Sequence, residues 1–155
     1  MPAHDDARRR AEELALMLSD LGMQRMSARV MAAFLFTDRP TLTLGELAEE
    51  LDASQGSVSG ALKSLHHVGM LERVPVPGSR RDHHRLRRDA WERLFSSQNE
   101  AVRRMMAAAA DGIAATEADS PARGRLQEMH DFYTFMFREL PLLFERWRAE
   151  RDSRD

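Results

Sequence analysis

The amino-acid sequence predicts a mainly α-helical fold that contains one small β-hairpin. Three observations support this class. Residues 44–68 read as a short helix, a tight turn and a second helix, and residues 71–88 read as two short strands around a Pro-Gly-Ser turn. Residues 120–151 carry apolar side chains three and four positions apart, which is typical of a long helix. The predicted architecture is a helix-turn-helix with a hairpin, flanked by helices at both ends.

Two helices are expected before the helix-turn-helix. The first spans residues 5–21 and ends at Gly22, because glycine readily adopts the left-handed conformation found after helix ends. The second spans residues 27–37 and ends before the Asp38-Arg39-Pro40 segment. The first helix carries apolar residues on one face, at Leu14, Met17, Leu18 and Leu21, and the second is expected to turn Val30, Ala33 and Phe34 inward.

The helix-turn-helix has clear start and stop signals. Thr43 is a good N-cap, and Glu46 three residues later can complete a capping box. Asp52-Ala53 forms the turn, Ser54 caps the second helix, and Gly69 follows its end at Val68. The buried positions expected in the second helix are Val58, Ala61, Leu62 and Leu65.

The other face of this second helix is unusually small and polar. It carries Gln55, Gly56, Ser57, Ser59, Gly60, Lys63 and Ser64. An ordinary solvated helix face carries Glu, Lys and Arg, because these are better helix formers than glycine and serine. A helix that enters a DNA major groove about 12 Å wide has a reason to be slim and rich in short hydrogen-bonding groups. A surface helix that merely happens to be rich in small residues is the alternative.

The hairpin that follows is basic. Pro75 marks the first strand, residues 71–76, as an edge strand, since proline cannot donate a hydrogen bond to the ladder. Residues 54–88 contain seven basic side chains and two acidic ones, a net charge of +5, whereas the whole chain has −2. A concentration of positive charge beside a slim polar helix indicates a nucleic-acid surface, although a basic run alone is as often a solvated face.

Residues 42–86, LTLGELAEELDASQGSVSGALKSLHHVGMLERVPVPGSRRDHHRL, resemble the winged helix-turn-helix of MarR-type bacterial transcription regulators, and most resemble the GbsR-like branch. The resemblance is strong over residues 23–90 and weaker at both ends. It implies a homodimer joined through N- and C-terminal helices, and commonly a repressor that is relieved by a small ligand. The Arg81-Asp82 pair is similar to the pair at the tip of the family's wing.

These features predict the DNA contacts. Major-groove contacts are expected from the second helix, at Ser54, Gln55, Ser57, Ser59 and Lys63. Phosphate or minor-groove contacts are expected from the wing, at Arg80, Arg81 and Arg85. Asp82 is expected to orient Arg81. A two-fold symmetric dimer requires a pseudo-palindromic operator with half-sites about one helical turn apart.

Two long helices are expected after the wing. The first runs from Asp89 to about Glu117, with Gln98 filling a gap in its apolar seam, and the second from about Ser120 to Arg151 with an expected kink at Pro141. Residues 132–137 are apolar on most sides and are expected to be buried, which favours a dimer over an intramolecular helical bundle. The dimer residues predicted by spacing are Leu126, Met129, Tyr133, Met136, Leu140, Leu143 and Trp147.

Length and composition limit the function class. We expect one domain over residues 1–155, with a DNA-binding unit at 23–90 and helical dimerisation regions at 1–22 and 90–155. There is no cysteine, no apolar run of membrane-spanning length and no signal-peptide core, so we expect a cytoplasmic protein. Catalytic motifs are absent, and neither an enzyme nor a cofactor is expected. A protein-interaction module, or a DNA binder without sequence preference, is the main alternative.

A metal-dependent enzyme is the second alternative, and it depends on the histidine pairs His66-His67 and His83-His84. Neighbouring residues point about 100° apart on a helix and to opposite faces on a strand, so neither pair forms a metal site alone. One histidine from each pair and Asp82 could meet in the folded unit, but no other acidic or histidine cluster supports a metal site. No metal is therefore expected.

Overall fold

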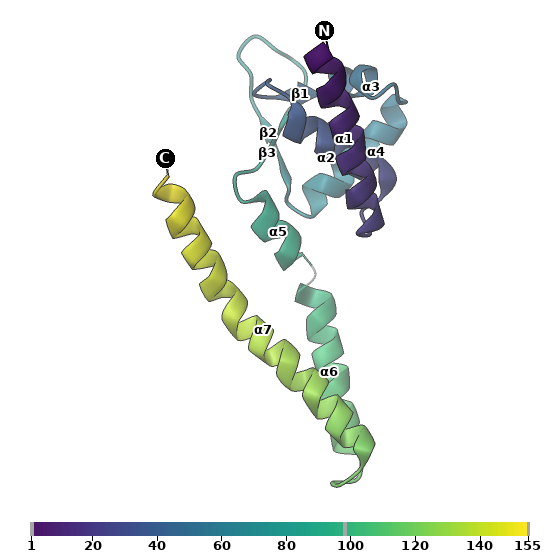
Figure 1. Ribbon diagram of the computed structural model, residues 1–155, viewed down its shortest axis with the longest axis vertical. Helices are drawn as coiled ribbons and strands as arrows, with labels where there is room; N and C mark the ends of the chain where they lie inside the picture. Colours follow the sequence, from purple (N-terminus) through teal and green to yellow (C-terminus); the bar gives the residue numbers. More distant parts are fainter. Residues whose placement is uncertain (1, 98, 155) are drawn as a thin grey trace. The chain divides into compact units, whose positions relative to one another are not determined.

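The computed structural model describes residues 2–97 and 99–154 and divides the chain into two compact units. Residues 1–94 form unit 1 and residues 95–155 form unit 2. The fold is mainly helical with a small antiparallel sheet, which confirms the predicted class (Figure 1). Among the described residues, no helix combines the length and the apolar character needed to span a lipid bilayer.

Unit 1 contains the helix-turn-helix and the wing. Its helices are α1 (Pro2–Asp20), α2 (Arg25–Phe36), α3 (Leu44–Glu50) and α4 (Gln55–His67), and α5 (Ala90–Ser96) begins at its end. The predicted caps are confirmed: Thr43 and Glu46 form a capping box at α3, and the Ser54 side chain accepts from the Ser57 N–H at α4. Gly69 has a φ of 79°, as expected of a glycine after a helix.

The sheet has three strands where the sequence predicts two. Strands β2 (Leu71–Val74) and β3 (His83–Leu86) form the wing hairpin, and β1 (Leu42–Thr43) pairs with the other edge of β3. The order β1-β3-β2 leaves β2 at an edge, which agrees with Pro75 directly after it. The sequence pattern does not show β1, because two residues are too few for alternation to be recognised.

The core of unit 1 forms where α2, α3, α4 and the sheet meet. Its largest fully buried side chains are Met31, Leu42, Leu47, Met70, Val30 and Val58. All four positions predicted as buried in α4 are at most 5% exposed. Burying an aliphatic side chain of this size stabilises a fold by about 1.5–3 kcal/mol, so the opposite face of α4 is held outward by its buried face.

The chain after the wing differs from the prediction of one helix over residues 89–117. It forms α5, which ends at Ser96, and a separate α6 (Asn99–Ala115), with Ser97 in a turn. The consecutive serines explain this break, since serine hydroxyls compete with helical backbone hydrogen bonds. Gln98, which was expected to fill the apolar seam of a continuous helix, lies outside the described residues.

Unit 2 is a pair of packed helices (Figure 1). Helix α7 (Pro121–Asp152) begins after the N-cap Ser120 and lies along α6. A Cβ atom on Gly112 of α6 would lie 2.9 Å from Leu126 Cδ1, so the two helices approach closely there. Helix α7 has 32 residues and α6 has 17, and none of the α7 residues, all of which are described, is buried in the single chain. The expected burial of residues 132–137 therefore does not occur within one chain.

Candidate nucleic-acid interface

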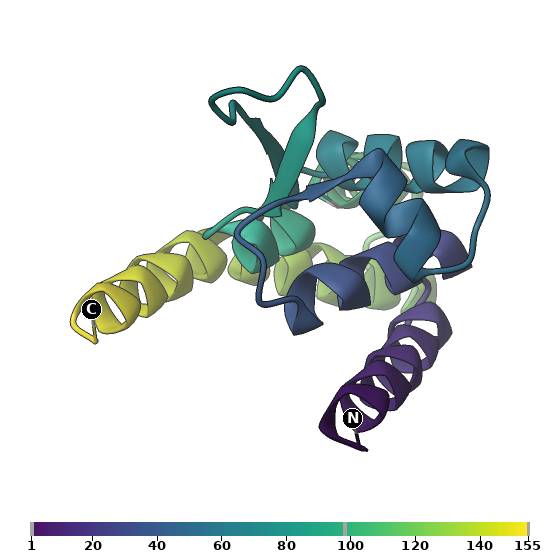
Figure 2. The ribbon, with the colours of Figure 1, turned by 90° about the horizontal axis from the view of Figure 1, so that it is seen from above.

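The predicted groove face of α4 is fully open. Figure 2 shows the wing hairpin standing beside α4, on the same side of unit 1. The exposed residues of this face are Ser54, Gln55, Gly56, Ser57, Ser59, Gly60, Lys63 and Ser64. Lys63 is the single lysine of the chain. Ser54 Oγ lies 2.9 Å from Ser57 Oγ, so the first turn of α4 presents a linked pair of hydroxyl groups.

The two glycines of this face are not required by internal packing. A Cβ atom built on Gly56 or on Gly60 would meet nothing within 4 Å. Both residues have helical backbone, and neither has a positive φ. Glycine inside a helix lowers stability by about 0.5–1 kcal/mol relative to alanine. The slimness of this face therefore costs unit 1 stability and brings no packing advantage inside the unit.

A cleft lies between α4 and the wing and brings several predicted site residues together. It has a volume of about 530 Å³. Ser59 and Lys63 line it from α4, and Arg73, Arg81 and Asp82 line it from the wing. Two of the predicted groove residues and the predicted wing-tip pair thus border one recess. Arg73, which the sequence reasoning did not select, belongs to the same recess.

Ion pairs within the wing change the expected picture of its charges. Asp82 Oδ2 lies 3.7 Å from Arg73 Nη1, so the ion pair of the wing-tip carboxylate is formed with Arg73. Its predicted role in orienting Arg81 stays a prediction. Arg85 Nε donates to Glu72 Oε1 at 2.7 Å, so a negative charge already neighbours this predicted phosphate contact. Arg80 and Arg81 are exposed near the Gly78 turn, where φ is 82°.

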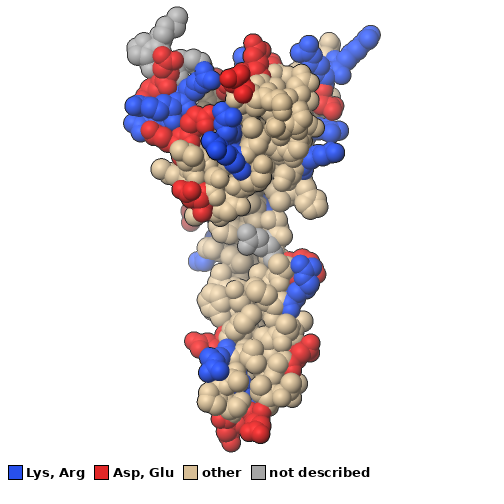
Figure 3. Space-filling view, turned by 90° about the vertical axis from the view of Figure 1, so that its right-hand side faces the viewer, with Lys and Arg blue, Asp and Glu red and all other residues tan. Residues whose placement is uncertain are grey.

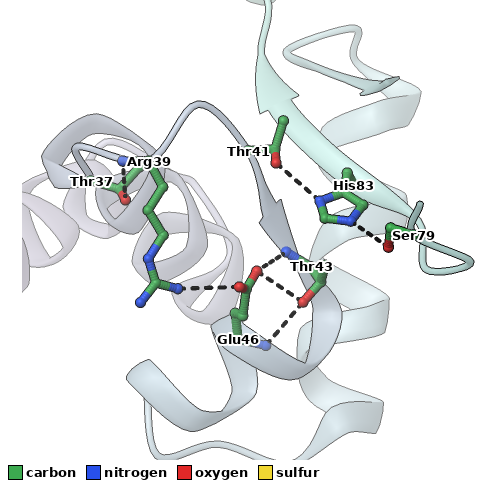
Figure 4. Close-up of polar contacts among 7 residues, drawn as sticks. All are labelled: Thr37, Arg39, Thr41, Thr43, Glu46, Ser79 and His83. Atoms are coloured by element: carbon green, nitrogen blue, oxygen red, sulfur yellow. Dashed lines mark hydrogen bonds and ion pairs between the residues drawn. The ribbon is translucent and has the colours of Figure 1, made fainter. Parts of the chain in front are cut away.

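Polar contacts of His83, the first residue of β3, fix the base of the wing (Figure 4). His83 Nδ1 lies 3.0 Å from Thr41 Oγ1, and His83 Nε2 lies 2.8 Å from Ser79 Oγ. The segment before β1, the start of β3 and the wing loop are therefore connected through one imidazole.

The neighbouring cap of α3 is held in the same region (Figure 4). The Thr43 N–H donates to Glu46 Oε2 at 2.8 Å, and Arg39 lies 3.3 Å from Glu46 Oε1. The hydrogen bond from the Thr43 backbone lowers the pKa of Glu46, against the effect of partial burial, and the Thr43 hydroxyl and Arg39 add to the lowering. Glu46 is therefore held as a carboxylate in the role that the capping box requires.

The histidine pairs meet across the fold but do not form a metal site. His66 of α4 and His84 of β3 lie within hydrogen-bond distance; burial lowers the pKa of both rings, and the charge of Asp82 only partly opposes this. Within residues 2–97 and 99–154, no group of three or more histidine or acidic side chains is arranged to hold a metal ion. The sequence shows both histidine pairs but not which members face each other.

The two units differ in the charge of the face that Figure 3 shows. Unit 1 carries both basic and acidic side chains there, whereas the visible face of unit 2 is mostly uncharged, with charged residues at its margins. Leu143 and Trp147 of the predicted dimer residues are 49% and 41% exposed, and the other five are partly buried. Further exposed apolar side chains are Phe132, Phe135 and Leu142 on α7, Leu16 and Met17 on α1, and Leu21 directly after α1.

Comparisons with known proteins agree with this geometry. A model of the MarR family matches residues 21–82, and a model of MmpR5-like MarR family transcriptional regulators matches residues 89–150. The HTH-type transcriptional regulator MmpR5 of Mycobacterium tuberculosis is 29% identical over 137 residues, which cover 88% of this chain and 83% of the relative. The crystal structure of a transcriptional regulator aligns with a TM-score of 0.76 at 27% identity, covering 93% of this chain and 99% of that one.

The first matched region contains the helix-turn-helix, β2 and the wing loop up to Asp82, and the second contains α5, α6 and most of α7. Proteins of this kind are regulators and not enzymes. The matched models and relatives, over a fold in which a helix-turn-helix is followed by a β wing, place the chain in the MarR family of winged-helix transcriptional regulators.

Proposed function

We propose that this chain is a homodimeric repressor that recognises a specific double-stranded DNA sequence. In the proposed complex, α4 lies in the major groove of one half-site, with Gln55, Ser57, Ser59 and Lys63 at base edges or phosphates. Arg80 and Arg81 contact the flanking backbone or minor groove. Regulators of the MarR family bind double-stranded DNA and act as dimers, which supports both parts of the proposal.

The observation that carries the proposal is the open, slim face of α4. Gly56 and Gly60 face open space and satisfy no packing requirement within the chain. An external surface that approaches the helix backbone closely explains these glycines, and a major groove is such a surface. A second supporting observation is the recess between α4 and the wing, which is bordered by Lys63, Arg73 and Arg81.

Replacing Gly60 with alanine tests this explanation directly. Gly60→Ala should stabilise unit 1 by about 0.5–1 kcal/mol, because alanine is the better helix former. The same change should weaken binding to the preferred duplex, because the added methyl group occupies the space of the groove wall. The preferred duplex is first selected from a random DNA pool with the purified protein.

Gly124→Ala is the matched control. Gly124 lies inside α7, also faces open space, and is two positions from Leu126, so the two residues are on different sides of the helix. It should stabilise the chain without changing DNA affinity. If Gly60→Ala binds the selected duplex as tightly as the wild type does, α4 is not the groove-facing helix.

The dimer is supported by the apolar side chains that one chain leaves exposed. Phe132 is 56% exposed, Leu143 49% and Leu21 86%, and exposed apolar patches of large size on a monomer mark an interaction surface. We assign the partner on α7 to a second copy of the chain, since two-fold symmetry places two α4 helices on one operator. The operator is then pseudo-palindromic.

In the proposed mode of control, a small ligand relieves repression. Relief by a small ligand rests on the sequence resemblance to MarR-type repressors, as does the assignment to the GbsR-like branch. The model that matches residues 89–150 is MmpR5-like. We place the protein in the cytoplasm, where its DNA partner is accessible.

The salt dependence of binding tests sequence specificity. Raising the salt concentration would lower the affinity of a non-specific polycation for all duplexes alike, whereas the proposed sequence-specific protein keeps a preference for its operator.

A further inference from the structure

Helix α4 and the wing are joined by a direct contact between two histidines. Nε2 of His66, in the last turn of α4, lies 2.9 Å from Nδ1 of His84. The rings meet edge to face with their centroids 5.1 Å apart, and His84 is only 4% exposed. His84 lies on β3, the central strand, opposite Leu42 of β1 and Arg73 of β2. This contact therefore links α4 to the middle of the sheet from which the wing extends.

The contact depends on protonation. A hydrogen bond between two ring nitrogens requires a proton on one nitrogen and a free lone pair on the other. When both rings are charged, both facing nitrogens carry protons, and the hydrogen bond is replaced by repulsion between two N–H groups and two positive charges. One proton can be accommodated between the rings, but a second cannot.

The surroundings keep the two rings neutral at pH 7. Burial lowers the pKa of His66, the charge of Arg73 adds to this, and a hydrogen bond to the Leu71 backbone and the charge of Asp82 partly oppose it. Burial likewise lowers the pKa of His84, and the neighbouring charges of His66 and Arg73 lower it further. Double protonation is therefore reached only below the ordinary histidine pKa of about 6.5.

Charged groups around the pair come from α4 and the wing. Arg73 on β2 and His83 on β3 are the basic neighbours within the sheet, and Lys63 and Arg81 line the same cleft. The residues that line the cleft from the β1–α3 junction, Thr43, Leu44 and Gly45, are uncharged. Among the described residues lining this cleft, Asp82 is the one acidic group, and it is paired with Arg73. The environment thus opposes a second positive charge.

We propose that His66 and His84 are positioning residues that hold the wing in a fixed orientation against α4, and that double protonation in mild acid releases this contact and reduces operator specificity. The inference rests on the proposed DNA-binding function. The expected pH dependence of specific binding differs from that of non-specific binding. Protonation adds positive charge, so binding to unrelated duplexes should be unchanged or tighter in acid. Only the preference for the operator should fall, because it requires α4 and the wing to be correctly placed together.

The test measures binding of the full-length chain to its selected duplex and to a scrambled duplex from pH 7.5 to pH 5.5 at constant ionic strength. The ratio of the two affinities should fall about tenfold across this range for the wild type. The double variant His66→Gln/His84→Gln carries two neutral side chains that can hydrogen-bond each other, and its ratio should stay flat. Circular dichroism at each pH confirms that the double variant is folded.

Two single variants serve as matched controls. His67→Gln changes the exposed neighbour of His66 on the same helix, and it should keep the wild-type pH dependence. His83→Gln changes the neighbour of His84, whose contacts are to Thr41 and Ser79, and the pH dependence should persist in this variant. A pH dependence that disappears in either single variant overturns the assignment to the His66–His84 pair.

A measurement without DNA keeps the inference testable if the double variant does not fold. Ring resonances of the free wild-type protein, followed by NMR, should show His66 and His84 titrating together and below the ordinary histidine pKa of about 6.5. Independent titration of both rings at the ordinary value overturns the inference. Absence of any operator preference at pH 7.5 overturns the proposed function instead, whereas a preference that does not depend on pH overturns only the histidine mechanism.

Discussion

The Nε atom of Arg85 on β3 lies 2.7 Å from Oε1 of Glu72, its direct cross-strand partner on β2. The second oxygen of Glu72 lies 3.5 Å from Arg87 Nη1. One carboxylate therefore partly neutralises two arginines of the basic hairpin. Exposed ion pairs of this kind contribute about 0–1 kcal/mol, so a DNA phosphate could replace Glu72 as the partner of Arg85 at small cost.

Removing the Glu72 charge should strengthen DNA binding without improving specificity. Glu72→Gln frees Arg85 for a phosphate, so affinity should rise for all duplexes, and the slope of log affinity against log salt should steepen by about one. Titrations at four or more salt concentrations measure this slope. Glu128→Gln removes the same charge from an exposed position on α7 and should leave the slope unchanged. An unchanged slope in Glu72→Gln would show that Arg85 does not reach the DNA.

The two arginines at the wing tip should differ in their effects. Arg81 lines the recess beside α4, so Arg81→Ala should cost more affinity than Arg80→Ala, and its loss should be larger on A·T-rich flanks, where the minor groove is narrow. Asp82→Ala should also weaken binding, although it removes a negative charge, because it frees Arg73 and leaves the tip less ordered. Tighter operator binding by Asp82→Ala would show that only bulk charge matters at this wing.

The exposed apolar side chains of α7 predict a specific loss of assembly. Met136→Glu or Trp147→Glu should convert the dimer to a monomer or to aggregates, because a buried unpaired carboxylate costs several kcal/mol. Operator affinity should then fall as the half-sites become uncoupled. Sedimentation velocity at micromolar concentration measures the assembly state. Glu145→Lys changes the charge of the same helix two positions from Leu143, on the other face, and should remain dimeric. A folded, monomeric wild type would remove the basis of this prediction.

Asp89 should make stability depend on pH in acid. Burial opposes ionisation of Asp89, but hydrogen bonds from Arg87 and Arg93 outweigh it and lower the pKa of Asp89 to about 2. Because the folded pKa lies below the unfolded one, the stabilisation is complete above the unfolded value, near 3.8, and disappears as the pH falls through about 2. With solvent screening at this partly exposed site, we expect Asp89→Asn to cost about 1 kcal/mol at pH 7. Urea unfolding at pH 7 and pH 3 should show a smaller cost at pH 3.

Local signals explain which parts of the fold the sequence could predict. The capping box of Thr43 and Glu46, the N-cap Ser54 and the terminal Gly69 act within a few residues, so the pattern alone placed the helix-turn-helix correctly. The break between α5 and α6 also has a local cause at Ser96 and Ser97. The apolar spacing continues through this break, so periodicity alone predicts one continuous helix.

Contacts between distant segments could not be derived from the pattern. The pairing of β1 with β3, the approach of His66 to His84 and the ion pair between Arg73 and Asp82 all depend on the register of β3, which a sequence of alternating residues does not specify. The same is true of the Glu72–Arg85 pair, which changes the expectation for a predicted DNA contact. Charge counting gave the net charge of the wing but not which charges neutralise one another.

Thr43 has two structural roles. It is the last residue of β1, where it pairs with His83 of β3, and its hydroxyl group caps α3. The first helix of the helix-turn-helix and the wing strand are consequently mechanically continuous, with no intervening linker to absorb movement. A force or ligand that rotates α3 would therefore also move β1 and the start of β3, from which the wing extends. Regulation of such a unit would act by reorienting the helix-turn-helix and the wing together. Independent movement of the wing would be confined to the loop between β2 and His83.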